Sequence, residues 1–254
     1  MTDTTCATRL YVEDDLAEGR SIGLDHARAH YLRSVLRLGR GAAVGLFNGR
    51  DGEWRARIDG LGKGWAPLLV ESHLKAQDGI PDIWLLFAPI KRARIDFLAE
   101  KATELGVARL LPVSTRHTAV SRVNRERLAA NAREAAEQCE RLSVPEVAEL
   151  RRLFDLLADW PSERRLLVCA EAGPSRPLAE VLAEAAGGPR GPWALLTGPE
   201  GGFAESELDA LRKLPFVTAV GLGPRVLRSD TAALAALACW QAVLGDGREA
   251  APRD

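Results

Sequence analysis

Two glycine-rich segments each lie between an apolar run and a helical pattern, where a loop can bind a small molecule. The first is Gly198-Pro-Glu-Gly-Gly202, directly after the apolar residues 194–197. Glycine permits positive φ angles and close approach of a ligand to the backbone, and free N–H groups near a helix start favour polar or anionic groups. The segment does not fit the pattern GxxxxGK[ST], which excludes a P-loop. We therefore predict a ligand-binding loop, with an ordinary strand-to-helix turn as the alternative.

The second segment, residues 220–231, carries Arg225 and Arg228 immediately before a helical pattern. A dinucleotide-binding fingerprint needs a third glycine that this segment lacks. Because cations are unfavourable at a helix N-terminus, their presence indicates binding or catalysis. The alternative is a helix capped by Ser229 or Asp230, preceded by two solvated arginines.

Two other polar segments, residues 100–107 and 134–141, are interpreted on their own as a helix end and a solvated helix face. Patterns for metal or hydrolase chemistry are missing. Of the four histidines only His26 and His30 have a ligand-like spacing, without a third ligand nearby. The four cysteines include no CxxC pair, and no GxSxG motif occurs. We therefore predict no metal and no Ser/His/Asp catalysis.

The composition is that of a folded globular protein. The chain has 254 residues, 46% of them hydrophobic, and 34 basic against 35 acidic side chains give a net charge of −1. This length fits one large or two modest domains, and the charge balance argues against disorder and against a wholly basic nucleic-acid coat. Residues 85–141 hold eleven basic and seven acidic side chains, which face either an anionic partner or solvent.

The start of the chain does not resemble a secretory signal. It has an acid where a signal peptide needs basic residues, and it lacks an apolar core. The longest apolar run, residues 232–240, is too short to span a bilayer. With its separated cysteines interpreted as free thiols, the protein is predicted to be cytoplasmic and not associated with a membrane.

The first 75 residues predict a small, mostly β unit with one helix, arranged as a barrel. Short apolar runs between turn signals indicate strands, and apolar residues at helical spacing indicate the helix. The predicted strands are residues 9–12, 42–48, 53–58 and 68–74, and the predicted helix is 26–38. Residues 76–81 are the predicted linker.

After this linker, apolar runs alternate with helical patterns, which predicts an α/β domain with a mostly parallel sheet. The predicted strands are residues 83–89, 107–113, 166–170, 194–197 and 217–222. The predicted helices are residues 92–105, 125–141, 177–186, 204–214 and 229–244.

Five segments, taken in order, resemble the RsmE family, bacterial methyltransferases that act on N3 of a uridine in 16S ribosomal RNA. Each match is weak alone, but the five together are specific and span most of the chain. They are residues 30–37, 101–107, 134–138 with Arg141 and Pro145, 196–203 and 222–232. Two positions depart from the family pattern: Glu140 stands where glycine is usual, and Ser229-Asp230 replaces the commoner Thr-Glu.

The resemblance implies a PUA-like RNA-binding β-barrel over residues 1–75 and a SPOUT-type α/β domain over residues 80–247. Such a domain has a deep trefoil knot near its C-terminus, an exception to the usual absence of knots. The resemblance also implies S-adenosyl-L-methionine as the cofactor in the knot, and a homodimer with its sites at the subunit interface. The implied partner is 16S rRNA in the small ribosomal subunit.

The resemblance assigns the cofactor pocket to the two glycine-rich loops and to the end of the strand that precedes them. The residues expected to bind the cofactor are Val168, Glu171, Thr197, Gly198, Pro199, Gly201, Gly202, Leu222, Gly223 and Leu227.

For catalysis, uracil N3 must lose a proton, and negative charge then builds up on the uracil oxygens. An arginine guanidinium would stabilise that charge, and we expect Arg228, and after it Arg225, to do so. Glu200 either accepts the proton or fixes its loop by accepting backbone N–H bonds, with some preference for the second role. The residues expected to contact RNA phosphate are Arg9, Arg33, Arg37, Lys91 and Arg94.

Three other functions stay open at this point. The chain could be a non-enzymatic RNA-binding or ribosome-assembly protein that uses the barrel alone. It could be a related knotted methyltransferase with another RNA target. A nucleotide-dependent enzyme is disfavoured because the phosphate-binding fingerprints are missing.

Overall fold

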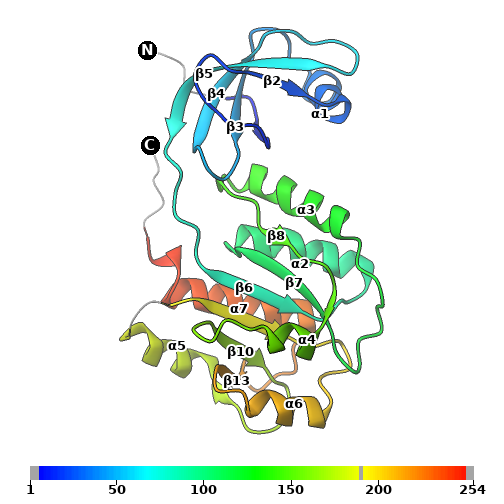
Figure 1. The fold of residues 1–254 in the computed structure, drawn as a ribbon, viewed down its shortest axis with the longest axis vertical. Helices are drawn as coiled ribbons and strands as arrows, with labels where there is room; N and C mark the ends of the chain where they lie inside the picture. The colour runs from blue at the N-terminus through cyan, green and yellow to red at the C-terminus, as the bar shows by residue number, and fades with distance from the viewer. Residues whose placement is uncertain (1–5, 189–190, 250–254) are drawn as a thin grey trace. The chain divides into compact units, whose positions relative to one another are not determined.

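The computed structural model describes residues 6–188 and 191–249, and the chain divides into two compact units (Figure 1). The first contains Met1–Gly79 and Ala136–Val144, and the second contains Ile80–Ala135 and Pro145–Asp254. No pattern in the sequence indicated that residues 136–144 belong to the first unit. Residues 1–5, on which the prediction of no secretory signal partly rests, lie outside the described residues.

The first unit is built on a five-stranded sheet in the order β1-β3-β4-β5-β2. Its strands are β1 (Arg9–Tyr11), β2 (Ser21–Leu24), β3 (Ala43–Phe47), β4 (Glu53–Ile58) and β5 (Ala66–Lys75). Neighbouring strands are antiparallel except β1, which pairs parallel with β3. The four strands predicted here are confirmed, whereas β2 was not predicted. β1 and β2 lie at the two ends of the order, and no pairing between them is recorded in the described residues.

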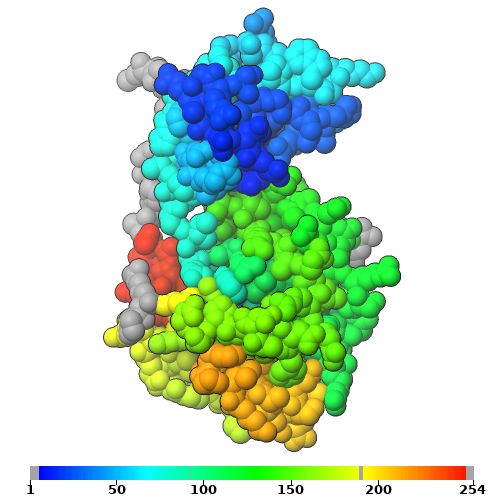
Figure 2. Space-filling view, in the orientation of Figure 1, coloured from blue at the N-terminus to red at the C-terminus, as the bar shows by residue number. Residues whose placement is uncertain are grey.

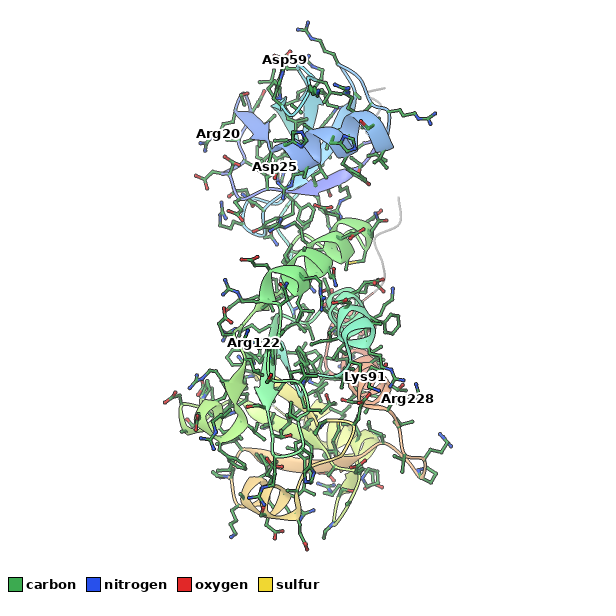
Figure 3. The ribbon with its side chains drawn as sticks, turned by 90° about the vertical axis from the view of Figure 1, so that its right-hand side faces the viewer. Arg20, Asp25, Asp59, Lys91, Arg122 and Arg228 are labelled. Atoms are coloured by element: carbon green, nitrogen blue, oxygen red, sulfur yellow. The ribbon has the colours of Figure 1, made fainter. Side chains whose placement is uncertain are left out.

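A short helical segment follows β2, and Figure 3 marks Asp25 at its start. α1 (His26–His30) continues into a π-helical turn, Tyr31–Val35. The Asp25 carboxylate caps the segment by accepting a bond from the Arg28 N–H at 2.8 Å. The helix predicted at residues 26–38 is therefore confirmed as far as residue 35. It ends before Arg37, whose φ of +55° is incompatible with a right-handed helix.

The second unit is an eight-stranded sheet in the order β11-β13-β10-β12-β6-β7-β8, with β9 paired to β7. All of its pairings are parallel. The strands are β6 (Ile83–Phe87), β7 (Arg109–Ser114), β8 (Glu146–Val147), β9 (Arg151–Arg152), β10 (Arg165–Cys169), β11 (Arg176–Pro177), β12 (Trp193–Thr197) and β13 (Val217–Gly221). The predicted α/β architecture with a parallel sheet is confirmed, and only the two-residue strands were missed.

The helices of the second unit are α2 (Arg92–Glu104), α3 (Arg125–Gln138), α4 (Leu153–Ala158), α5 (Leu178–Ala186), α6 (Glu205–Arg212) and α7 (Ser229–Val243), with a final 3-10 turn, η2 (Asp246–Arg248). The last turn of α3, from Ala136, belongs to the first unit. All were predicted except α4 and η2. Within the described ranges, none of these helices combines the length and the apolar character needed to cross a membrane.

Alternate residues of the central strands face two separate hydrophobic layers. Leu85 and Leu195 pack in a core with side chains of α2, α5 and α7, whereas Leu86 and Leu196 pack in a second core with α4. In the space-filling view, the segments around α4 and α6 cover the visible face of this unit (Figure 2). Because both sheet faces are covered, the strands are continuous apolar runs, which is why they could be predicted.

The parallel arrangement brings the carboxyl ends of the strands to one edge of the sheet. β10 lies between β12 and β13, and Cys169 is in register with both Thr197 and Val220. The loops that leave these three strands therefore start at the same level and side by side. This is the edge at which open parallel sheets bind ligands.

Arg9 belongs to the framework of the first unit, although we expected it to contact RNA phosphate. Its guanidinium pairs with Glu53 at 2.7 Å, lies 4.7 Å from the Phe47 ring centre, and donates to the carbonyl oxygens of Ala136 and Glu137 at 3.3 Å. The last two bonds cap the C-terminal end of α3, where a positive charge is favourable. We therefore do not count Arg9 among the proposed RNA contacts.

Helix α3 ends at Gln138, three residues before the predicted end, because Glu140 takes a left-handed conformation with φ of +64°. This conformation costs an L-residue about 1–2 kcal/mol but costs glycine almost nothing. The position is the one at which the resemblance led us to expect glycine, and the exposed Glu140 side chain ends the helix without it.

We predict that Glu140→Gly raises the free energy of unfolding by about 0.5–1 kcal/mol, because it removes this backbone strain. The measurement is urea denaturation followed by circular dichroism. Cys139→Gly is the matched control, since Cys139 is exposed and has a negative φ, and it should lower the stability. An equal effect of both substitutions would contradict the assigned strain.

Candidate functional site

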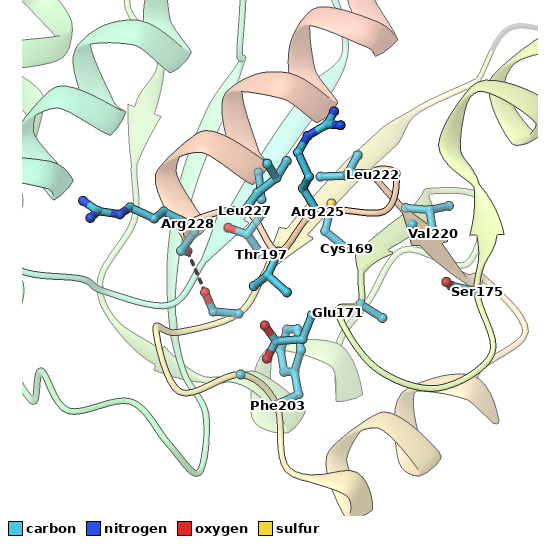
Figure 4. A pocket seen from close by; sticks show the side chains of 18 of the residues that line it. Cys169, Glu171, Ser175, Thr197, Phe203, Val220, Leu222, Arg225, Leu227 and Arg228 are labelled. Atoms are coloured by element: carbon cyan, nitrogen blue, oxygen red, sulfur yellow. Dashed lines mark hydrogen bonds between the residues drawn. The ribbon is translucent and has the colours of Figure 1, made fainter.

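The loops after β10, β12 and β13 enclose a cavity of about 370 Å3 (Figure 4). This size is within the range of small-molecule sites. Polar groups and apolar side chains both line it. The lining includes Cys169, Ala170 and Glu171 after β10, Thr197 to Glu200 with Gly202 and Phe203 after β12, and Val220 to Ser229 with Ala232 after β13.

The loop after β12 is a tight glycine turn. The Gly202 N–H donates to the Pro199 carbonyl at 2.9 Å, and Gly202 has a φ of +68°. A Cβ atom on Gly202 would overlap the Glu171 carboxylate. The positive φ therefore favours glycine at this position, and any larger residue would also displace the exposed Glu171 side chain.

The loop after β13 exposes two cations. Arg225 and Arg228 are exposed, and no ion pair or hydrogen bond of either side chain is recorded in the described part of the chain. In Figure 4 the two side chains extend from the loop in different directions. The loop also carries Val226, which is 83% exposed. The arrangement supplies unpaired positive charge at the mouth of the cavity.

A single short hydrogen bond joins the two glycine-rich loops. Ser229 Oγ donates to the carbonyl oxygen of Gly198 at 2.6 Å (Figure 4). The alternative interpretation, in which Ser229 or Asp230 caps α7, is wrong: Arg228 is the N-cap residue and no side chain caps the helix. Ser229 instead holds the start of α7 against the loop after β12.

Thr197 has a buried polar atom without a partner in the protein. Its side chain is buried at the floor of the cavity, and Oγ1 makes no hydrogen bond in the described residues. Buried hydroxyl groups are almost always hydrogen-bonded, so this atom indicates a partner that enters the cavity. The neighbouring Cys169 is a neutral thiol, because burial raises its pKa to about 12.

Contacts on the outer side hold the loop after β12 in place. His117, in the loop after β7, lies with Nδ1 3.2 Å from the Gly202 carbonyl, to which Nδ1 must donate. The buried carboxylate of Glu207 accepts the Arg116 N–H at 2.8 Å and the Ala204 N–H at 2.9 Å. Sequence reasoning missed both residues. Glu207 stands three residues after the N-cap of α6, the spacing of a capping box, whereas nothing in the sequence pointed to His117.

Glu200 does not fix its loop in the way that we preferred. No backbone N–H donates to its carboxylate in the described residues; Oε1 lies 3.7 Å from a guanidinium nitrogen of Arg94, and both side chains are partly exposed. Lys91, at the end of the segment after β6, is exposed at the same edge of the sheet, where Figure 3 labels it with Arg228. The Glu200 carboxylate thus lies near several cations at the cavity mouth.

Most of the residues predicted to form the site come together at this cavity. Thr197, Gly198, Pro199, Gly202, Glu171, Leu222, Gly223, Leu227, Glu200, Arg225 and Arg228 all line it. Val168 lies in the core beneath the cavity, and Gly201 is on the outer side of its turn, next to His117. Arg33 and Arg37 are exposed in the first unit. No group of three potential metal ligands is found within the described ranges.

Comparison with known proteins adds independent evidence. Residues 78–241 match the family model of an RNA methyltransferase domain, and residues 24–64 match that of an RNA methyltransferase PUA domain. The chain is 32% identical to the ribosomal RNA small subunit methyltransferase E of Rickettsia conorii, over 91% of this chain and 93% of that protein. The protein of the same name from Bacillus subtilis is 27% identical, over 90% and 94% of the two chains.

Solved structures show the same fold. The crystal structure of a ribosomal RNA small subunit methyltransferase E from Neisseria gonorrhoeae, bound to S-adenosyl methionine, is 29% identical and has a TM-score of 0.83, covering 94% of this chain and 98% of that one. A methyltransferase of Legionella pneumophila with its bound cofactor is 27% identical with a TM-score of 0.79, over 92% and 97% of the chains. The loops, the cavity and these matches agree: the chain belongs to the RNA methyltransferase family that includes the ribosomal RNA small subunit methyltransferases E.

Proposed function

We propose that the protein transfers a methyl group from S-adenosyl-L-methionine to N3 of a uridine in the 16S rRNA of the small ribosomal subunit. The observation that carries this proposal is the cavity between the loops after β10, β12 and β13, with the unpartnered Thr197 hydroxyl inside and two unpaired arginines at its mouth. The Neisseria relative, which has the same fold, was crystallised with this cofactor.

The residues of the cavity fit an adenosyl cofactor. Leu222, Leu227 and Ala232 supply apolar contacts for a flat ring, and the glycine turns present backbone groups for its polar edge. The Thr197 hydroxyl needs a hydrogen-bond partner that the protein does not supply. We therefore assign cofactor binding to Glu171, Thr197, Gly198, Pro199, Gly202, Leu222, Gly223 and Leu227, and leave Val168 and Gly201 as supporting residues.

The reaction is an in-line displacement, in which alignment supplies much of the rate. When bound, S-adenosyl-L-methionine supplies a methyl group on a positively charged sulfur. N3 of uracil must first lose its proton, and negative charge then spreads to the two ring oxygens. Arg228 is placed to stabilise this charge, and Arg225 is the second candidate, because both are unpaired cations beside the cavity.

Glu200 is the proposed proton acceptor. Its carboxylate lines the cavity and is partly exposed, so a nucleobase can reach it. The N3–H bond would break toward the carboxylate and N3 would keep the electron pair. N3 would then form the new bond to the methyl carbon as the bond from that carbon to sulfur breaks and leaves its electron pair on the sulfur, which becomes a neutral thioether. Arg94 would hold the carboxylate at the mouth through its ion pair.

Cations outside the cavity, in each of the two units, are further candidates for RNA contact. Lys91 and Arg94 follow β6 at the same sheet edge, and Arg33 and Arg37 are exposed in the first unit. Cations at such positions neutralise phosphates and make binding depend on salt concentration.

The family supports four finer statements. We infer from the resemblance to the RsmE family that residues 80–247 form a SPOUT-type domain with a trefoil knot. We infer a homodimer from the resemblance to the RsmE family, and the exposed side chains of Phe97 and Val226 are candidates for its contacts. We also infer that the PUA-like unit covers residues 1–75 and that the protein acts in the cytoplasm, where its ribosomal target is located.

The proposed activity is tested with small ribosomal subunits from cells that lack the enzyme. We expect purified protein and S-adenosyl-L-methionine to produce 3-methyluridine, identified by mass spectrometry of the digested RNA. Another methylated nucleoside would show that the protein is a methyltransferase but that N3 of uridine is not its target. No methylation, with intact RNA and cofactor, would favour a binding protein.

A pair of substitutions in one loop tests the assigned cofactor site. Gly202→Ala should weaken cofactor binding in calorimetry, because a φ of +68° is unfavourable for alanine and the new Cβ would displace the Glu171 carboxylate from the cavity lining. Gly201→Ala is the matched control: its nearest neighbour is His117 Cβ at 3.5 Å, and it is expected to bind the cofactor with an affinity close to that of wild type. Equal binding by both variants would refute the assignment.

Arg228→Ala separates catalysis from cofactor binding. We expect turnover to fall by about 100-fold, as for the loss of one group that stabilises transition-state charge. The cofactor dissociation constant should change by less than about threefold, since Arg228 is exposed at the mouth. Single-turnover methylation and calorimetry measure the two quantities, and a parallel loss of both would rule out the catalytic role.

A further inference from the structure

Trp65, in the β4–β5 hairpin of the first unit, holds an open indole face on the surface. The residue is 54% exposed. Its ring lies along the backbone of residues 60–62: a Cβ on Gly60 would contact Cζ3 and Cη2 at one end of the indole, and a Cβ on Gly62 would overlap Nε1 and Cε2 at the other end. One face is therefore seated on the backbone, and two glycines are needed for that seat.

The hairpin around Trp65 is closed by backbone hydrogen bonding. The Gly62 N–H donates to the Trp65 carbonyl at 2.9 Å, and the two residues form an isolated β-bridge. The Asp59 N–H donates to the Pro67 carbonyl at 3.0 Å on the far side of the turn. The indole is thus preorganised, because little side-chain freedom is left to lose when another flat group stacks on it.

The surroundings of Trp65 favour an anionic, aromatic partner. The exposed imidazole of His26, on α1, packs against Gly64, and Lys63 is exposed next to Gly64 in the chain. The nearby carboxylates are already engaged: Asp25 caps α1, and Asp59 lies 3.3 Å from Arg40 and 3.7 Å from Arg57. No ion pair of Lys63 is recorded among the described residues.

We propose that Trp65 stacks on an unpaired base of the RNA substrate, with Lys63 and His26 beside the adjoining phosphates. Aromatic side chains bind single-stranded RNA by stacking on base faces, and neighbouring cations follow the backbone. His26 and Lys63 lie within residues 24–64, which match the RNA methyltransferase PUA domain, and Trp65 directly follows that range. The inference deepens the proposed function, on which it rests, by naming a binding residue far along the chain from the cavity loops.

The test compares Trp65→Ala, Trp65→Leu and Trp65→Phe with the wild-type protein. KM for the small ribosomal subunit should rise on the order of tenfold for the first two, because a stacked base is lost. Trp65→Phe keeps an aromatic face and should stay within about threefold of wild type. The matched control is Phe154→Leu, which alters a 38% exposed aromatic residue of the second unit and should leave KM unchanged. Circular dichroism and cofactor calorimetry verify that each variant is folded.

A second readout identifies the partner directly. Titration with a short fluorescein-labelled single-stranded RNA, at constant salt, should show the same order of affinities as KM. Unchanged KM and RNA affinity in Trp65→Ala would overturn the inference while leaving the methyltransferase intact. A raised KM with unchanged RNA affinity would indicate that Trp65 contacts a protein of the small subunit. That result would also overturn the proposed stacking on RNA. If the wild type methylates nothing, the RNA titration still decides the role of Trp65.

Discussion

The parallel pairing of β12, β10 and β13 is the constraint on which the site depends. It places Thr197, Cys169 and Val220 at one level, so that three loops leave the sheet together. Specific contacts hold the loop after β12: His117 lies at hydrogen-bond distance from the Gly202 carbonyl, Glu207 accepts from two backbone N–H groups, and Ser229 joins this loop to the one after β13. The cavity is therefore shaped by backbone fixed before any ligand binds, which lowers the cost of binding.

The main elements could be predicted because their apolar patterns match the burial that the fold imposes. The strands from β6 to β13 have both faces covered, so they appear as apolar runs, and helices such as α2 show one apolar side. The missed elements carry no such pattern: β8, β9 and β11 are two residues long and exist through pairing with a neighbour. The return of residues 136–144 to the first unit depends on Arg9 and Phe47, which are distant in sequence.

Within the site, the local sequence predicted where the ligand-binding loops lie, but not which residues their charged side chains contact. Glycine spacing identified both loops of the cavity, since close approach and positive φ demand glycine at positions such as Gly202. The partners of charged residues depend on the tertiary fold. Arg9 was expected to contact RNA phosphate, but it forms an ion pair with Glu53. Glu200 was expected to accept hydrogen bonds from backbone N–H groups, but its carboxylate lies next to Arg94. Arg228 is exposed, as its proposed role requires, and no ion pair of its guanidinium with an acidic side chain is recorded in the described residues.

A crystal structure of the protein with S-adenosyl-L-methionine tests the central claim most directly. The account predicts cofactor density between the loops after β10, β12 and β13, with a hydrogen bond from the cofactor to Thr197 Oγ1, the buried atom that has no partner in the protein. The glycine loops should move little, because their contacts already fix them. Density at another place on the molecule, or a cofactor in this cavity that leaves Thr197 Oγ1 unpaired, would contradict the account.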